Sequence, residues 1–212
     1  MNIEFKKYWR KSSLKKKEDG LFLLNHISEK KPKNFLEIGV FHGVTSRNVC
    51  ELLYKIHGNN FTFTGIDLFE NDNKKLKEEI APKTKFSNPL KSIYYNYILR
   101  LDPYSFESVI KLLKKFKKNI NLIKGNSNDE LKKINVNIFD YVFLDGGHKY
   151  ETVKNDLKCL IGVIKKNGII LCDDYNLSYA PGVKKAIDEF ILINDFNLKI
   201  INPRFAEISN KI

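Results

Sequence analysis

The chain has 212 residues, of which 42% are hydrophobic and 29% are charged, and its formal net charge is +12. This length is enough for one globular domain with a single core and too short for two ordinary domains. The eleven glycines and six prolines are too few for a collagen-like or low-complexity chain, and the hydrophobic fraction is too high for general disorder. Composition therefore predicts one folded domain and excludes fibrous and disordered proteins.

The apolar runs are short, such as residues 21–24 and 168–172, and fall far below the ~18 residues of a membrane span. Lysines interrupt the N-terminus, which lacks the apolar stretch of a signal peptide. The cysteines Cys50, Cys159 and Cys172 are odd in number, lack metal-type spacing and lie in apolar surroundings. We therefore expect no membrane insertion and a cytoplasmic protein with buried thiols.

A positive charge of this size is typical of proteins that bind nucleic acid, because clustered cations release counterions from phosphate backbones. Most of the basic residues here are lysines, however, and arginine is the preferred residue for phosphate and base-edge recognition. The arginines are Arg10, Arg47, Arg100 and Arg204. We therefore predict a solvated basic face, concentrated at residues 6–33 and 111–124, and disfavour nucleic acid as a partner.

From residue 34 onward, short β-branched runs alternate with longer amphipathic runs, a pattern typical of βαβ units in a parallel sheet. The expected strands are residues 34–40, 61–67, 120–124, 138–145 and 168–173. The expected helices are residues 44–56, 128–134, 150–166 and 181–194. Two further strand-like runs, 198–202 and 205–209, predict a closing antiparallel hairpin. The expected fold is α/β, a Rossmann-like doubly wound sheet, mostly parallel, with helices on both faces.

Two segments depart from this repeat. Residues 1–33 are basic and contain a helix-like run, and we expect a lid or an arm before the main domain at 34–212. About fifty residues separate the second and third strands, far more than a crossover needs, so residues 70–118 should contain a helical insertion. This insertion either covers the active site or only packs on the sheet. A role of these segments in a homo-oligomer stays open.

The first two strands end in residues that indicate a nucleotide-like ligand. The segment FLEIGVFHGVTS places Glu37, Gly39 and Gly43 around the turn from the first strand into a helix, at the edge where open parallel sheets bind ligands. It does not match the dinucleotide fingerprint G-x-G-x-x-G, and an acidic residue before the first glycine suits a cationic ligand. Asp67 ends the second strand, where a carboxylate can accept both hydroxyl protons of a ribose; the alternative is a helix cap or a loop carboxylate.

The third strand ends in LIKGNSND, where Asn126 and Ser127 could border an adenine. Ser127 and Glu130 also have the spacing of a capping box, in which a hydroxyl and a carboxylate bind free amide groups at a helix start. The sequence therefore leaves Ser127 with two possible roles, in ligand binding and in helix capping.

Taken together, the E-x-G-x-x-x-G turn, the acidic end of the second strand and the final hairpin resemble class I S-adenosylmethionine-dependent methyltransferases over residues 34–210. The resemblance implies a seven-stranded sheet, with Gly39 and Gly43 near the methionine part of the cofactor and Asp67 on its ribose. Glu37 is suited to a nearby sulfonium cation, directly or through water, because opposite charges attract.

Three carboxylates follow the fourth and fifth strands, in the stretches FDYVFLDGGHKYETVKNDL and GIILCDDYN. Asp145, Asp173 and Asp174 should therefore meet at the cofactor edge of the sheet, where hard divalent cations such as Mg²⁺ would relieve their repulsion. The alternative is a set of turn and cap carboxylates. The segment is similar to metal-dependent O-methyltransferases of the catechol type and, more closely, of the macrocin and mycinamicin sugar types, in which acidic residues at these positions bind the metal.

The resemblance implies methyl transfer from S-adenosylmethionine to a hydroxyl of a small molecule, for example a sugar or a glycosylated metabolite. Asp145 or His148 would accept the hydroxyl proton, and we favour His148, in the loop after the fourth strand. Gly146 and Gly147 stand before His148 where the sugar enzymes have a further acidic residue. The alternatives are a metal-independent N- or O-methyltransferase on the same fold, and an RNA-binding protein or RNA methyltransferase that uses the basic surface.

Overall fold

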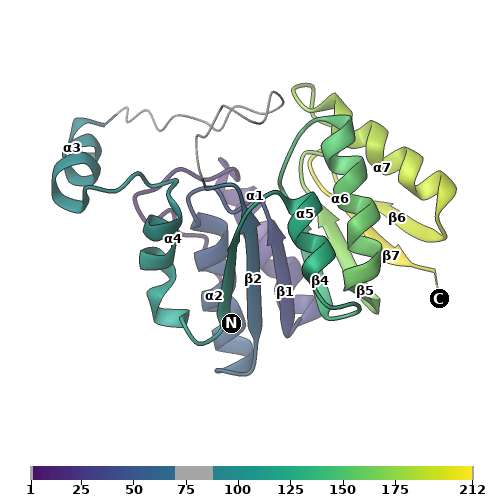
Figure 1. The fold of residues 1–212 in the computed structure, drawn as a ribbon, viewed down its shortest axis with the longest axis horizontal. Coiled ribbons are helices and arrows are strands. Elements are labelled where there is room, and N and C mark those ends of the chain that lie inside the picture. Colours follow the sequence, from purple (N-terminus) through teal and green to yellow (C-terminus); the bar gives the residue numbers. More distant parts are fainter. Residues whose placement is uncertain (1, 70–87, 212) are drawn as a thin grey trace.

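The computed structural model describes residues 2–69 and 88–211, which form one seven-stranded sheet between two layers of helices (Figure 1). The strands are β1 (Asn34–Ile38), β2 (Thr62–Asp67), β3 (Ile120–Lys124), β4 (Phe139–Leu144), β5 (Ile164–Cys172), β6 (Phe196–Ile200) and β7 (Ala206–Asn210). Their order is β3-β2-β1-β4-β5-β7-β6. The first five strands are parallel, and β7 runs antiparallel to both of its neighbours. The predicted fold class is confirmed.

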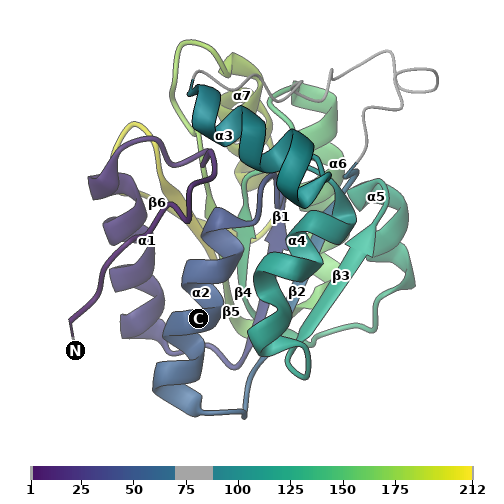
Figure 2. The same cartoon turned by 90° about the vertical axis from the view of Figure 1, so that its left-hand side faces the viewer.

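Helices cover both faces of the sheet. On one face lie α1 (Lys17–Lys30), α2 (Val44–His57) and α4 (Phe106–Leu113), which Figure 2 shows side by side. On the other lie α5 (Ser127–Glu130), which continues into a 3-10 turn (Leu131–Lys133), and then α6 (Tyr150–Val163) and α7 (Pro181–Ile193). Separate apolar clusters fill the two interfaces. The central strands are apolar on both faces because both are covered.

Stacked rings in the first of these interfaces hold β1 against its neighbours. The Phe35 ring lies 5.8 Å from that of Phe63 on β2 and 5.1 Å from that of Tyr141 on β4, measured between centroids. All three side chains are fully buried. Burying aromatic side chains of this size contributes ~2–3 kcal/mol each relative to exposure. The inner strands that end at the candidate site are therefore firmly held.

The second half of the predicted insertion is helical, whereas residues 70–87 lie outside the described residues. It contains α3 (Pro89–Ile93), a π-helical stretch (Tyr94–Leu99), α4 and a 3-10 turn (Lys114–Phe116). The π-helical stretch packs against the N-terminal segment, where Trp9 contacts the Tyr94 ring edge-on. The Arg10 guanidinium also lies 5.9 Å from the Tyr95 ring centroid.

The α6 to β5 connection differs from the sequence prediction. The helix ends at Val163, and the strand begins at Ile164, several residues earlier than expected. Buried Ile164 pairs with Phe139 before the register shifts, which extends β5 toward the helix. Tertiary pairing therefore overrides the helical pattern of Lys165 and Lys166.

Within the described ranges, every helix is too short or too polar to cross a lipid bilayer. Cys50 and Cys172 are buried, Cys159 is half-buried, and all three are free thiols.

Candidate functional site

A cavity of about 1120 Å³ opens at the carboxyl ends of the five parallel strands, β1 to β5. It exceeds the volume of ~300–1,000 Å³ of a typical pocket for one small ligand. The cavity brings together most of the residues that the sequence singled out: Gly39, Asp67, Asn126, Ser127, Asp145, His148 and Asp174. The N-terminal segment forms another wall, through residues between Lys7 and Lys15. Glu37, Gly43 and Asp173 lie behind this lining.

Gly39 is the point where the first strand turns into the site. Its φ of +91° belongs to the region that favours glycine, and a Cβ at this position would lie 2.0 Å from the carbonyl oxygen of Asp145. The turn after β1 thus packs directly against the turn after β4. Only a residue without a side chain permits this approach.

Gly43 lies at the start of α2, outside the cavity lining, and its predicted place near the cofactor stays a prediction. It precedes α2 with a φ of +73°, and a Cβ here would lie 3.0 Å from Val109 on α4. The glycine lets α2 and α4 approach each other.

Glu37 is fully buried beneath the glycine turn rather than exposed to a ligand. The Ser46 hydroxyl donates to its Oε2 at 2.5 Å, and Oε1 has no hydrogen-bond partner among the described residues. Burial raises the pKa of Glu37 to about 8, against the lowering effect of the Ser46 hydrogen bond. Without a bound cation the side chain is therefore largely a neutral acid at neutral pH, and its pairing with a sulfonium stays a prediction.

The raised pKa of Glu37 makes stability depend on pH. An unfolded glutamate titrates near 4.5 and the native one near 8, so the native state holds an extra proton between these values. The free energy of unfolding should therefore be highest below pH 4.5 as far as Glu37 is concerned, and should fall by roughly 3–5 kcal/mol as pH rises through 8. Urea denaturation at pH 5.5 and 8.5 measures this, and Glu37→Gln should lose less stability across the interval than the wild type. Equal losses would contradict the assignment.

Asp67 organises the loops beside β2 and faces the cavity. Its Oδ2 accepts from the amide of Phe41 at 2.7 Å, and its Oδ1 accepts from the amide of Phe69 at 3.1 Å. The hydroxyl of Tyr104 also donates to Oδ1, at 2.8 Å. Sequence reasoning missed Tyr104, which lies in the insertion without any recognisable motif. The two oxygens offer about four acceptor positions, so these three donors leave one position, on Oδ2, for a ribose hydroxyl proton.

The helix start after β3 corrects the predicted capping box. Asn126 is the cap, and its side chain accepts from the amide of Asn128 at 3.0 Å. Ser127 is the first helical residue, and its hydroxyl donates to Asp156 on α6 at 2.5 Å. Asn126 is the cap in place of Ser127 because its side-chain carbonyl oxygen reaches the backbone amide two residues on. Both Asn126 and Ser127 line the cavity.

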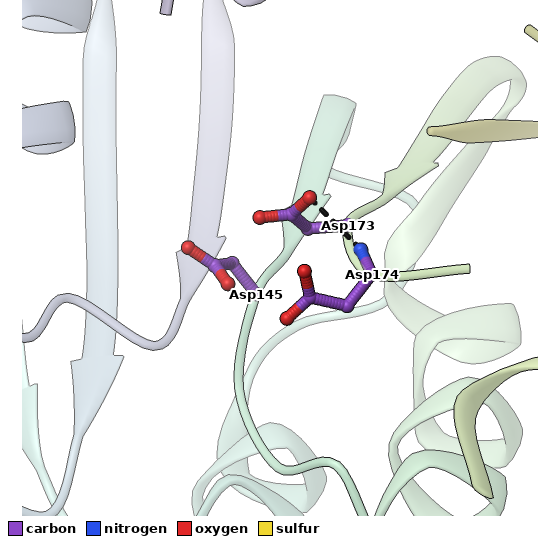
Figure 3. A group of neighbouring side chains, drawn as sticks. All are labelled: Asp145, Asp173 and Asp174. Atoms are coloured by element: carbon purple, nitrogen blue, oxygen red, sulfur yellow. Dashed lines mark hydrogen bonds between the residues drawn. The ribbon is translucent and has the colours of Figure 1, made fainter. Parts of the chain in front are cut away.

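The three predicted acids converge, as Figure 3 shows. One carboxylate oxygen from each of Asp145, Asp173 and Asp174 lies within 4.8 Å of the others. Successive residues of a strand point to opposite sides, but Asp174 adopts a left-handed conformation with a φ of +57°. This backbone conformation of Asp174 allows both aspartates after β5 to face Asp145.

Burial and mutual repulsion set the charges of this acidic cluster. Burial, and then the neighbouring charge of Asp173, raise the pKa of Asp145 well above its usual value. Burial and the charge of Asp174 raise the pKa of Asp173 to about 6, against the lowering effect of Arg204. Burial would also raise the pKa of Asp174, but hydrogen bonds from His148 and Tyr179 lower it below the usual value. Simultaneous ionisation of all three carboxylates is therefore unfavourable unless a positive charge compensates them.

Side chains that sequence reasoning missed, among them Arg204 and Tyr179, contact the acidic cluster. An Arg204 nitrogen lies 2.5 Å from Asp173 and 3.5 Å from Asp174, and the Tyr179 hydroxyl donates to Asp174 at 2.6 Å. His148, which was predicted, lies with Nε2 2.9 Å from Asp174. Arg204 stands in the turn between β6 and β7, where the sequence indicated only a hairpin.

The donor set fits a divalent cation. Three carboxylates supply hard oxygen ligands, and the raised pKa values of Asp145 and Asp173 show that a positive charge would stabilise them. Asp145, Asp173 and Asp174 are the residues that would hold it.

Residues 36–175, more than half of the chain, match the family model of a methyltransferase domain. A search of the curated proteins found no match. The fold is similar to that of the SAH-bound methyltransferase PaMTH1 of Podospora anserina, at 17% identity and a TM-score of 0.61, covering 93% of this chain and 80% of that one. It is also similar to the O-methyltransferase NovP, at 18% identity and a TM-score of 0.63 (91% and 81%).

A third similar structure is CalS11, a TDP-rhamnose 3'-O-methyltransferase of calicheamicin biosynthesis, at 15% identity and a TM-score of 0.59, covering 91% of this chain and 79% of that one. At these identities the structures establish the shared fold. The family match covers the glycine turn, Asp67 and the acidic cluster, which line or support one cavity. The sequence-based prediction of a methyltransferase is confirmed, and the chain belongs to this family of methyltransferase domains.

Proposed function

We propose that this protein transfers a methyl group from S-adenosylmethionine to a hydroxyl of a small molecule, with the assistance of a divalent cation such as Mg²⁺. The observation that carries the proposal is the single cavity that Asp67, Asp145 and Asp174 share. Its volume of about 1120 Å³ leaves room for an acceptor beside a cofactor. A methyl donor at β1 and β2 would thus lie next to an acceptor at β4 and β5.

On the donor side, Asp67 would bind the ribose, and Asn126 and Ser127 would border the adenine. Gly39 would let the backbone approach the methionine part. The SAH-bound state of PaMTH1, which shares this fold, supports the choice of cofactor. Glu37 and Gly43 would support this half of the site from behind.

On the acceptor side we propose a sugar or a glycosylated metabolite, in a site closed by the N-terminal segment as a lid. The CalS11 enzyme, which methylates a nucleotide sugar on the same fold, supports this substrate class. The N-terminal segment supports the proposed lid because residues between Lys7 and Lys15 line the cavity.

The chain's own residues would orient the acceptor and remove its proton. When bound, S-adenosylmethionine supplies the methyl group and a divalent cation supplies positive charge beside the hydroxyl. Asp145 and His148 both line the cavity and are the candidates to accept the proton. The hydrogen bond between His148 and Asp174 would fix the imidazole and stabilise its protonated form.

Isothermal titration with S-adenosylhomocysteine tests the cofactor site, and Asp67→Asn should weaken binding about 10- to 100-fold, because the amide nitrogen cannot accept a ribose proton. Tyr104→Phe is the matched control: it removes a donor to the same oxygen but keeps the carboxylate, so affinity should hold or improve. No binding by the wild type at millimolar ligand would overturn the proposal.

A chelator tests the metal. Dialysis against a chelator should abolish turnover of hydroxylated acceptors, and Mg²⁺ should restore it. The second candidate function is metal-independent methylation on the same fold, favoured by the Arg204 guanidinium that already contacts Asp173. Turnover that is insensitive to the chelator would select this alternative.

A further inference from the structure

The Arg204 guanidinium lies between the acidic cluster and the N-terminal part of the chain. One nitrogen is 2.5 Å from Asp173, and the same nitrogen is 3.4 Å from the carbonyl oxygen of Ser13. Another nitrogen is 3.7 Å from Asp19 in the first turn of α1. The side chain is only 14% exposed. It is therefore a fixed, poorly solvated positive charge.

The Arg204 guanidinium contacts the acids and also lies 5.7 Å from the ring centroid of Phe205 in its own hairpin. Its Nε is buried and has no hydrogen-bond partner among the described residues, and the contacts with the acids come from the terminal nitrogens. An arginine side chain oriented by hydrogen bonds to the β6–β7 turn would not leave its Nε without a partner. The shortest polar contact of the side chain is thus the one with Asp173.

A divalent cation and this guanidinium would compete for the same carboxylates. The oxygens of Asp173 already accept from Arg204 and from the amide of Asp174. Any cation held by the cluster would also lie near a like charge, and repulsion at such distances is strong where water is scarce. The acids therefore cannot offer a cation their full charge while Arg204 keeps its position.

We propose that Arg204 is a resident counter-cation of the acidic cluster, which limits the affinity for divalent metal and yields its contact with Asp173 when metal binds. The proposal rests on the metal site of the proposed function. It assigns Arg204 as a positioning residue: the guanidinium keeps the acids together without metal and makes metal binding weak and reversible.

Mn²⁺ titration followed by electron paramagnetic resonance tests this without any acceptor. Arg204→Gln should bind Mn²⁺ about tenfold or more tightly than the wild type, because one nearby positive charge is gone. Arg204→Lys, which keeps the charge, should stay near the wild type. Arg47→Gln is the matched control: Arg47 is 16% exposed and pairs with Glu51 on α2, outside the cavity lining, so its loss should leave Mn²⁺ affinity unchanged.

An affinity of Arg204→Gln that is unchanged or weaker, including no binding in either protein, overturns the proposal. Weaker binding would show that Arg204 organises the metal ligands instead of competing with metal. Titration of the same samples with S-adenosylhomocysteine keeps the two proposals apart, because loss of cofactor binding would count against the proposed function and not against the role of Arg204.

The wild type provides a second measurement that does not depend on how Arg204→Gln folds. With only four arginines in the chain, ¹⁵N-arginine labelling gives few side-chain signals, and Arg204→Lys identifies the one from Arg204. Saturating Mg²⁺ should shift the Arg204 signal and leave that of Arg47 in place. An Arg204 signal that does not respond to Mg²⁺ overturns the proposal.

Discussion

Asp145→Asn is expected to reduce turnover by about 10³-fold or more while affinity for S-adenosylhomocysteine stays within about threefold. Asp145 is the member of the acidic cluster at the end of β4, and it lines the cavity from the central part of the sheet. The substitution removes both a metal ligand and a candidate base, but it preserves the shape of the side chain. Binding of the cofactor product should persist because the proposed ribose and adenine contacts come from other strands.

Steady-state kinetics with a hydroxylated acceptor that the enzyme methylates and calorimetry with S-adenosylhomocysteine measure the two effects in one preparation. Asp195→Asn is the control, because it makes the same chemical change on a side chain that is 84% exposed and should leave both values unchanged. Asp173→Ala should also lose metal-dependent turnover. Turnover near the wild-type level in both single variants, Asp145→Asn and Asp173→Ala, would overturn the metal mechanism.

Gly39→Ala is expected to destabilise the protein by about 2–5 kcal/mol, through two effects. The left-handed backbone costs about 1–2 kcal/mol for a residue with a Cβ. The new Cβ would also lie 2.0 Å from the Asp145 carbonyl oxygen, so the turns after β1 and β4 must move apart, at a further cost of about 1–3 kcal/mol. Since Asp145 belongs to the displaced turn, the acidic cluster should be disturbed as well.

Thermal unfolding measures this effect, and Gly58→Ala is a matched control. Gly58 also has a positive φ, +61°, but a Cβ there meets nothing within 4 Å. Its substitution should therefore lose only the backbone contribution, about 1–2 kcal/mol. Equal destabilisation by the two substitutions would show that the contact between the turns contributes nothing.

Local sequence patterns are sufficient to predict the layers, the order of the elements and the ends of the strands that carry the site. Alternating β-branched and amphipathic runs are local signals, and parallel strands place their carboxyl ends at one edge. The positions of Asp67, Asp145 and Asp173 at that edge therefore follow from the amino-acid sequence. Their roles in binding and catalysis stay predictions.

Long-range packing, in contrast, decides which side chains meet at that edge and in what state. Arg204 and Tyr104 reach the site from a hairpin turn and an insertion, and no local pattern shows which distant carboxylate such a residue contacts. The local sequence around Glu37 does not show whether the side chain is exposed or buried. Only complete burial makes it a neutral acid near pH 7. Ser127 likewise is not the helix cap, because the side chain of Asn126 accepts from the amide of Asn128, and its hydroxyl donates to the distant Asp156. Local periodicity thus determines the elements, whereas tertiary contacts determine the partners and charges of the residues in the site.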